Sequence, residues 1–114
     1  MTYNSSLTTA NQLLKAGKLE DARREYQKLI ELKPNCPWNY YYLGQVFFQE
    51  EKWSDATLQY RQAIKLNPNS ANLHNSLAEV LIKQGELDEA INSSQKAISL
   101  SLIHISEPTR HRRI

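Results

Sequence analysis

The sequence contains a single cysteine, Cys36, among 114 residues, and it has no long apolar run. One cysteine excludes an internal disulfide and a CxxC metal site. No apolar stretch approaches the roughly 18 residues needed to span a bilayer. Residues 1–15 also lack the basic start and apolar core of a signal peptide. The composition therefore predicts a soluble, cytoplasmic chain with no membrane partner.

An excess of charge of one sign is also missing from most of the chain. Residues 1–100 hold 11 Lys and Arg against 11 Asp and Glu, and the net charge of +2 comes from the last 14 residues. Without a basic stripe, the body of the chain has nothing to hold a phosphate backbone. We therefore expect no nucleic-acid partner, and an RNA-reading helical repeat is the least favoured of the alternatives.

Catalytic motifs are absent as well. The sequence has no Gly-rich phosphate loop, no HExxH zinc motif and no nucleophile elbow. Carboxylates alternate with basic residues, as on solvated helix faces, and no His or cationic pocket can be assigned to Cys36. We predict no catalytic residue, no metal ligand and no cofactor, so the chain itself is not expected to be an enzyme.

The sequence does contain a period of 34 residues. Ala22, Ala56 and Ala90 are 34 apart, and Pro34 and Pro68 repeat one stop signal. The same spacing aligns Ile30, Ile64 and Ile98, and it aligns the acidic residues Asp21, Asp55 and Glu89. A period of this length indicates an array of supersecondary units that stack on one another.

Each unit is predicted to contain two helices. In the middle unit, the spacing of the apolar residues predicts a helix over 38–50, a polar break at 49–52 and a second helix that Pro68 ends. The expected core face of the first helix holds Tyr40, Leu43, Gly44 and Phe47, and that of the second holds Trp53, Ala56, Tyr60, Ala63 and Ile64.

Small residues recur at matching positions of the paired helices. Ala10, Gly44 and Ala78 are expected to face Ala22, Ala56 and Ala90, so that the two backbones approach closely, with Tyr60 filling the space beside them. Ser94 replaces this tyrosine in the third unit, which predicts weaker packing there. Glu51 stands where the other units have Gly17 and Gly85. It must either adopt a left-handed conformation, at a cost of about 1 kcal/mol, or sit in a different turn.

The period, the two-helix unit and the pattern Tyr40…Leu43-Gly44…Phe47…Ala56…Tyr60…Ala63…Pro68 resemble the tetratricopeptide repeat (TPR). The resemblance implies an all-α fold of three stacked helix-turn-helix hairpins, an α-solenoid that forms a short right-handed superhelix. It covers residues 3–100, with repeats at about 3–36, 37–70 and 71–100. His74 falls at the position of Tyr40 one repeat earlier, which predicts a packing role rather than a ligand role.

The resemblance also implies a concave groove lined by the first helices, in which a peptide or protein segment binds. The residues it places toward this groove are Asn11, Trp38, Tyr41, Gln45, Phe48, Asn72, Asn75 and Glu79, together with Leu14 and Ile82. Trp38, Tyr41, Gln45 and Phe48 form a second stripe on the helix 38–50. This stripe either forms an aromatic floor for the ligand or packs against neighbouring helices, and the sequence leaves both alternatives open.

Some members of the family grip the C-terminal carboxylate of heat-shock chaperones with Lys, Asn and Arg. Asn11 fits that pattern, but Leu7, Tyr42, Asn72 and Ser76 stand where the other groups would be, so this clamp is not expected. The alternative to a protein-binding scaffold is the N-terminal, non-catalytic arm of a larger bacterial glycosyl-, sulfo- or methyltransferase.

The register fails after Leu100. Residues 100–110 resemble the translation of a sequencing-library adapter, so 101–114 are interpreted as a non-native tail, either disordered or extending the last helix, and the third repeat as truncated. The helix 87–100 then ends the array while still carrying Ile91 and Ile98. Because terminal repeats need a polar outer face, self-association through this uncapped helix is expected.

Overall fold

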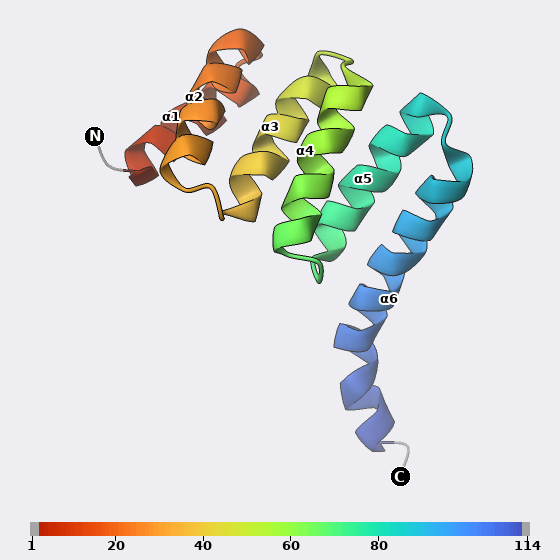
Figure 1. Cartoon of the computed structure of the whole chain (residues 1–114). Coiled ribbons are helices and arrows are strands. Elements are labelled where there is room, and N and C mark those ends of the chain that lie inside the picture. The colour runs from red at the N-terminus through yellow and green to blue at the C-terminus, as the bar shows by residue number, and fades with distance from the viewer. Residues whose placement is uncertain (1–2, 113–114) are drawn as a thin grey trace.

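The computed structural model describes the backbone of residues 3–112 and the side chains of residues 5–101. It consists of α1 (Tyr3–Lys15), α2 (Leu19–Leu32), α3 (Pro37–Gln49), α4 (Trp53–Leu66), α5 (Ala71–Gln84) and α6 (Leu87–Arg112). The six described helices form three antiparallel hairpins in a row (Figure 1). This confirms the predicted all-α array of three TPR-like hairpins. Among the described residues, no helix is both long and apolar enough to cross a membrane.

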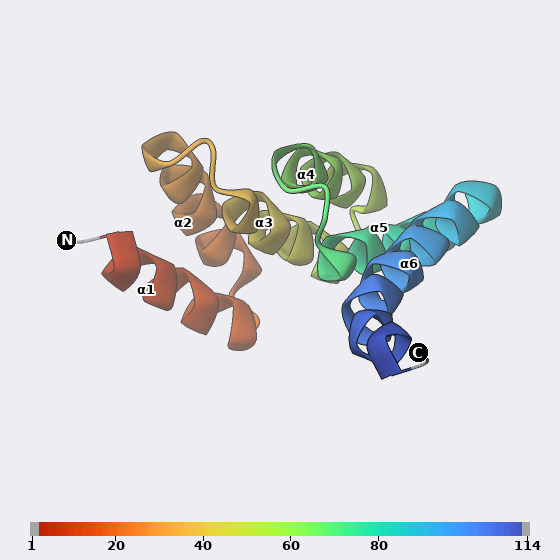
Figure 2. The ribbon, with the colours of Figure 1, turned by 90° about the horizontal axis from the view of Figure 1, so that it is seen from below.

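The hairpins stack so that each first helix contacts the second helix of the hairpin before it. Viewed from below, α2 and α4 lie along one side of the array, and α1, α3 and α5 follow along the other (Figure 2). Two clusters of buried residues run through the stack, one centred on Tyr26 and Leu29 and the other on Tyr60 and Leu81. Phe47 is half-buried and packs against both clusters, so it joins neighbouring repeats.

The small residues lie where the sequence predicts them. Ala22, Ala56 and Ala90 are buried, as are Ala10, Gly44 and Ala78 on the facing helices. Gly44 shows why the position must be small, because a Cβ atom built on it would lie 2.6 Å from Cε1 of Tyr60. The aromatic ring of Tyr60 therefore occupies the volume that a side chain at position 44 would need, as the sequence predicts.

One predicted core residue lies elsewhere, and two buried residues were not predicted. Tyr40 is half-buried, because its hydroxyl donates to the carbonyl of Pro34 in the inter-repeat turn over 2.8 Å. Asn39 and Val46 are instead fully buried on α3. The Asn39 side chain donates to the carbonyl of Leu29 over 3.3 Å, which satisfies a polar group inside the interface between α2 and α3. The helix thus buries more than the single face that its apolar periodicity predicted.

The three turns within the hairpins share one geometry. Gly17, Glu51 and Gly85 all have positive φ, at 79°, 61° and 81°. In each turn this residue donates its N–H three residues back, and the next residue donates five residues back, which is the Schellman pattern that ends a helix. Glu51 therefore adopts the left-handed conformation, and the alternative of a different turn is wrong.

Replacing Glu51 with glycine should stabilise the protein by about 1 kcal/mol, because glycine has no Cβ to penalise a positive φ. The melting temperature should rise by roughly 4 °C. The matched control is Glu51→Gln, which removes the charge and keeps the Cβ, and it should leave the melting temperature unchanged. If the glycine variant melts at or below the wild-type temperature, Glu51 is not strained as the structure indicates.

Candidate protein-binding groove

An exposed tryptophan on α3 is the most prominent feature of the face formed by the first helices. The side chain of Trp38 is 37% exposed, and its ring meets that of Tyr41 edge-to-face with centroids 5.6 Å apart. Tyr41 is itself half-buried, with its ring centroid 6.0 Å from that of Tyr60 and 5.2 Å from that of Tyr42. Tyr41 therefore belongs to the core and also supports Trp38, whose indole remains accessible to a ligand.

The hydroxyl end of Tyr60 brings α5 into the same neighbourhood. Burial raises the pKa of the Tyr60 hydroxyl well above its usual range, and the nearby Tyr41 and Glu79 raise this pKa further. Glu79 is exposed on α5, and it shares one face of that helix with the exposed residues Asn72 and Asn75 because the three are spaced by three and four positions. The structure thus places Tyr41 on α3 and Glu79 on α5 near one point.

Asn11 occupies the corresponding position on α1. It is half-buried, and the hydroxyl of Tyr26 donates a hydrogen bond to its Oδ1. Tyr26 is fully buried, and burial raises the pKa of its hydroxyl, with a smaller contribution from Tyr42, whose ring stacks on it at 5.6 Å. This bond fixes the orientation of the Asn11 amide. Asn11 is therefore a pre-oriented polar group at the start of the row that continues with the half-buried Gln45.

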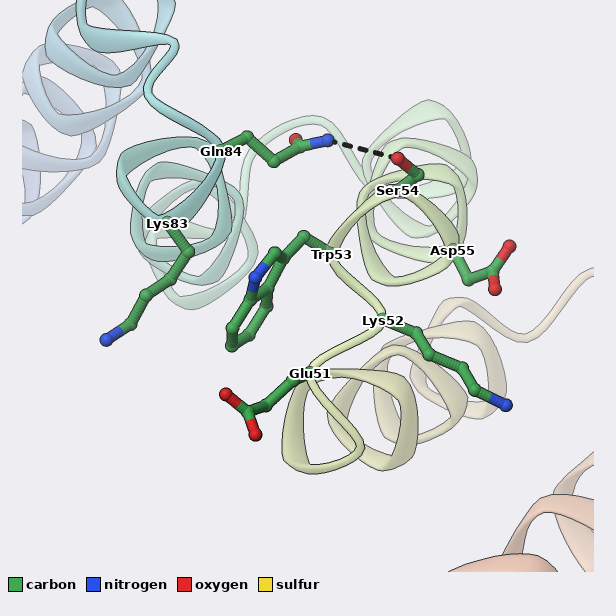
Figure 3. Close-up of a pocket in the computed structure, with 7 residues that line it drawn as sticks. All are labelled: Glu51, Lys52, Trp53, Ser54, Asp55, Lys83 and Gln84. Atoms are coloured by element: carbon green, nitrogen blue, oxygen red, sulfur yellow. Dashed lines mark hydrogen bonds between the residues drawn. The ribbon is translucent and has the colours of Figure 1, made fainter.

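Phe48 lies at the other end of α3 and is engaged in packing. Its ring meets that of Trp53 edge-to-face with centroids 5.1 Å apart, and both residues are half-buried. Trp53 in turn borders an open cavity of about 580 Å³ at the end of the α3–α4 hairpin, where its indole lies between Glu51 and Lys83 (Figure 3). The structure therefore joins Trp38 to Tyr41 and separates both from the contact made by Phe48.

A hydrogen-bond network that the sequence did not predict closes the α4–α5 side of this cavity. The amide nitrogen of Gln84 donates to the hydroxyl of Ser54 over 3.3 Å (Figure 3). The hydroxyl of Thr57 donates to the Gln84 carbonyl oxygen over 2.8 Å. These polar residues bridge neighbouring repeats, and the 34-residue period carries no signal for them because they do not recur.

The histidine between the second and third repeats takes the place of a tyrosine. Nε2 of His74 lies 2.8 Å from the carbonyl oxygen of Pro68, which matches the contact from Tyr40 to Pro34 one repeat earlier. Both side chains thus close an inter-repeat turn, which agrees with the packing role predicted for His74. Across the part of the chain with described side chains, no group of three or more His, Cys, Asp or Glu is placed to hold a metal ion.

The third hairpin leaves an apolar hollow at its outer face. A cavity of about 400 Å³ lies between α5 and α6, beside Ser94 and Ala90. Ile82, Leu87 and Ile91 line it and are each more than half exposed, and Ile98 on the same helix is 57% exposed. The predicted weak packing at Ser94 thus coincides with this hollow. The predictions for residues 102–114 concern side chains outside the described residues.

Comparison with known proteins supports the same architecture. A family model described as TPR repeat matches residues 10–50 and 44–85, and one described as tetratricopeptide repeat matches residues 71–104. No curated protein matched the sequence.

Among solved structures, MamA is 27% identical over 87% of this chain and 58% of its own, with a TM-score of 0.81. A MamA RS-1 double mutant is 19% identical over 92% of this chain and 59% of its own, with a TM-score of 0.88. The second TPR of Spaghetti (RPAP3), bound to the HSP90 peptide SRMEEVD, is 20% identical over 86% of this chain and 91% of its own, with a TM-score of 0.82. The chain spans about three-fifths of the MamA chains that it matches. With all three hairpins matched by repeat models, this chain belongs to the tetratricopeptide repeat family.

Proposed function

We propose that this chain is a non-enzymatic scaffold that binds an extended protein segment along the face formed by α1, α3 and α5. The observation that carries the proposal is the partly exposed indole of Trp38, held in place by Tyr41. A rigid aromatic ring that is partly exposed is the kind of residue that dominates the binding energy of protein interfaces. The RPAP3 domain, which shares the fold, was solved with a bound peptide, and this supports a peptide as the class of ligand.

The polar residues proposed for the groove suit the backbone of an extended segment. The amides of Asn11, Gln45, Asn72 and Asn75 can each donate to and accept from peptide groups. Glu79 is the only charged residue in the proposed set, so a ligand with a basic or neutral side chain at that point is favoured over an acidic one. Phe48 remains in the proposed site, although its ring packs against Trp53, and it contributes mainly to the rigidity of the surface.

Replacing Trp38 with alanine should weaken the binding of partner proteins by at least roughly tenfold, as expected of an aromatic hot spot. Binding is measured as the amounts of individual proteins captured from a cell extract by the immobilised chain. The matched control is Leu58→Ala, which removes another large exposed apolar side chain, from α4. If the Trp38 variant is folded, as judged by circular dichroism, and keeps every partner at the wild-type level, the stripe serves packing only.

We also propose that two copies pair through the apolar face of α5 and α6. At the positions where α3 and α5 bury Leu43, Val46, Leu77 and Val80, α1 carries the exposed polar residues Thr9 and Gln12. Because α1 offers no apolar surface there, pairing of two identical α5–α6 faces is favoured over head-to-tail stacking. Sedimentation at increasing protein concentration tests this, and a monomer at all concentrations would contradict it.

The alternative, an arm of a larger transferase, remains a prediction that depends on the coding sequence beyond residue 99. Reading that sequence in its source DNA also tests whether residues 101–114 are a non-native tail.

A further inference from the structure

A second groove lies on the second helices, between α4 and α6, and has a basic rim. Its volume is about 500 Å³, and Ile64 and Leu77 give it an apolar floor. The second helices supply its cationic residues, whereas the face proposed to bind a peptide belongs to the first helices. The groove therefore constitutes a separate surface.

The rim of this groove has cations in excess. Arg61, Lys65 and Lys96 line it against one carboxylate, that of Glu89. Arg61 spends its charge on an ion pair with Glu89 across the groove. No carboxylate within the described part of the chain forms an ion pair with Lys65 or Lys96, so these two ammonium groups face the groove as uncompensated charges.

The preceding repeat provides an internal comparison, because the equivalent positions lie 34 residues earlier. The positions of Lys65 and Lys96 are there occupied by Glu31 and Gln62. The remaining rim positions, those of Arg61 and Glu89, are occupied by Gln27 and Asp55. The earlier set thus has two carboxylates and no cation. The stacking of repeats does not require positive charge at this site, and the basic rim is a local property of the third repeat.

We propose that the groove between α4 and α6 binds an acidic peptide segment that carries an aliphatic side chain between two carboxylates. The aliphatic side chain would lie on Ile64 and Leu77, where burial of apolar surface favours binding. The flanking carboxylates would pair with Lys65 and Lys96, which are positioned to attract negative charge. Asn92 and Ser93 on α6 also line the groove and supply hydrogen-bonding groups for the peptide backbone.

The probe is a terminally blocked hexapeptide of alternating Glu and Leu, titrated into the isotopically labelled full chain and followed by NMR. The amide signals of Ile64, Asn92 and Ser93 should shift. The affinity should fall as salt is added, because the ion pairs are near the surface. A hexapeptide of alternating Lys and Leu should not shift these signals. If the acidic peptide shifts other signals instead, or if both peptides bind equally, the proposal is wrong.

The variant Lys65→Gln/Lys96→Gln should reduce the affinity for the acidic peptide roughly fivefold, which corresponds to the loss of two near-surface ion pairs. The matched control, Lys15→Gln/Lys18→Gln, removes the same charge from two exposed lysines outside the groove and should leave the affinity close to the wild-type value. Equal losses in both double variants would reduce the effect to net charge and overturn the proposal. Trp38→Ala should not affect this binding, so the outcome is independent of the proposed peptide face on the first helices.

Discussion

Replacing Tyr60 with alanine should lower the free energy of unfolding by about 3–5 kcal/mol. Tyr60 is one of the two largest fully buried side chains described, with 1% of its surface exposed. Its ring lies against the backbone of α3 at Gly44 and also belongs to the cluster that includes Leu77 and Leu81 of α5. Removing the ring therefore opens a cavity where three helices meet, and the neighbouring backbone cannot collapse into it without separating the repeats.

Urea denaturation followed by circular dichroism measures this loss. Tyr60→Phe is the matched control because it keeps the ring and removes only the hydroxyl, and it should cost about 1 kcal/mol. The third repeat already shows the consequence of a smaller residue, since Ser94 stands at this position and borders a cavity of about 400 Å³. A loss below about 1 kcal/mol in Tyr60→Ala would contradict the view that this ring joins the second and third repeats.

Replacing Gly44 with alanine should also destabilise the protein, by about 1–3 kcal/mol. Helix propensity alone predicts the opposite sign, because alanine is favoured over glycine inside a helix by about 1 kcal/mol. The reason for the reversal is steric, since the new methyl group would lie 2.6 Å from Cε1 and 2.8 Å from Cδ1 of the buried Tyr60. The first repeat pairs Ala10 with Tyr26, so a hairpin can accommodate both residues only if its helices are spaced for them.

A double-mutant cycle separates the two effects. In the Tyr60→Ala background the ring is gone, so Gly44→Ala should become neutral or stabilising, by up to about 1 kcal/mol. The coupling free energy between the two positions then measures the contact directly. If Gly44→Ala costs the same free energy in both backgrounds, the contact with Tyr60 is not what excludes a side chain at position 44.

The sequence was sufficient to predict those parts of the fold that recur every 34 residues. Ala22, Ala56 and Ala90, the positive φ of Glu51 and the break at Pro68 all follow from comparing equivalent positions. The period could not predict the buried Asn39, whose partner is a backbone carbonyl of the preceding repeat. Nor could it predict that Tyr40 would contact the turn at Pro34, because a helix that packs on three sides shows no single apolar face.

The candidate site was less predictable than the fold. The pattern placed Trp38 and Tyr41 in one stripe, and the structure shows them in contact with each other. Whether this stripe binds a ligand or only packs depends on exposure, which the sequence does not contain, and the ligand role of the proposed residues stays a prediction. The basic groove between α4 and α6 had no signal in the whole-chain charge, since Lys65 and Lys96 are offset by carboxylates elsewhere.

The central claim is that the first helices bind a protein segment through Trp38. Quantitative capture of proteins from a cell extract tests it most directly, with wild type, Trp38→Ala and Leu58→Ala compared side by side. We predict a set of partners that wild type and Leu58→Ala retain equally and that the folded Trp38→Ala variant loses. Identical partner sets for all three folded proteins would contradict the claim.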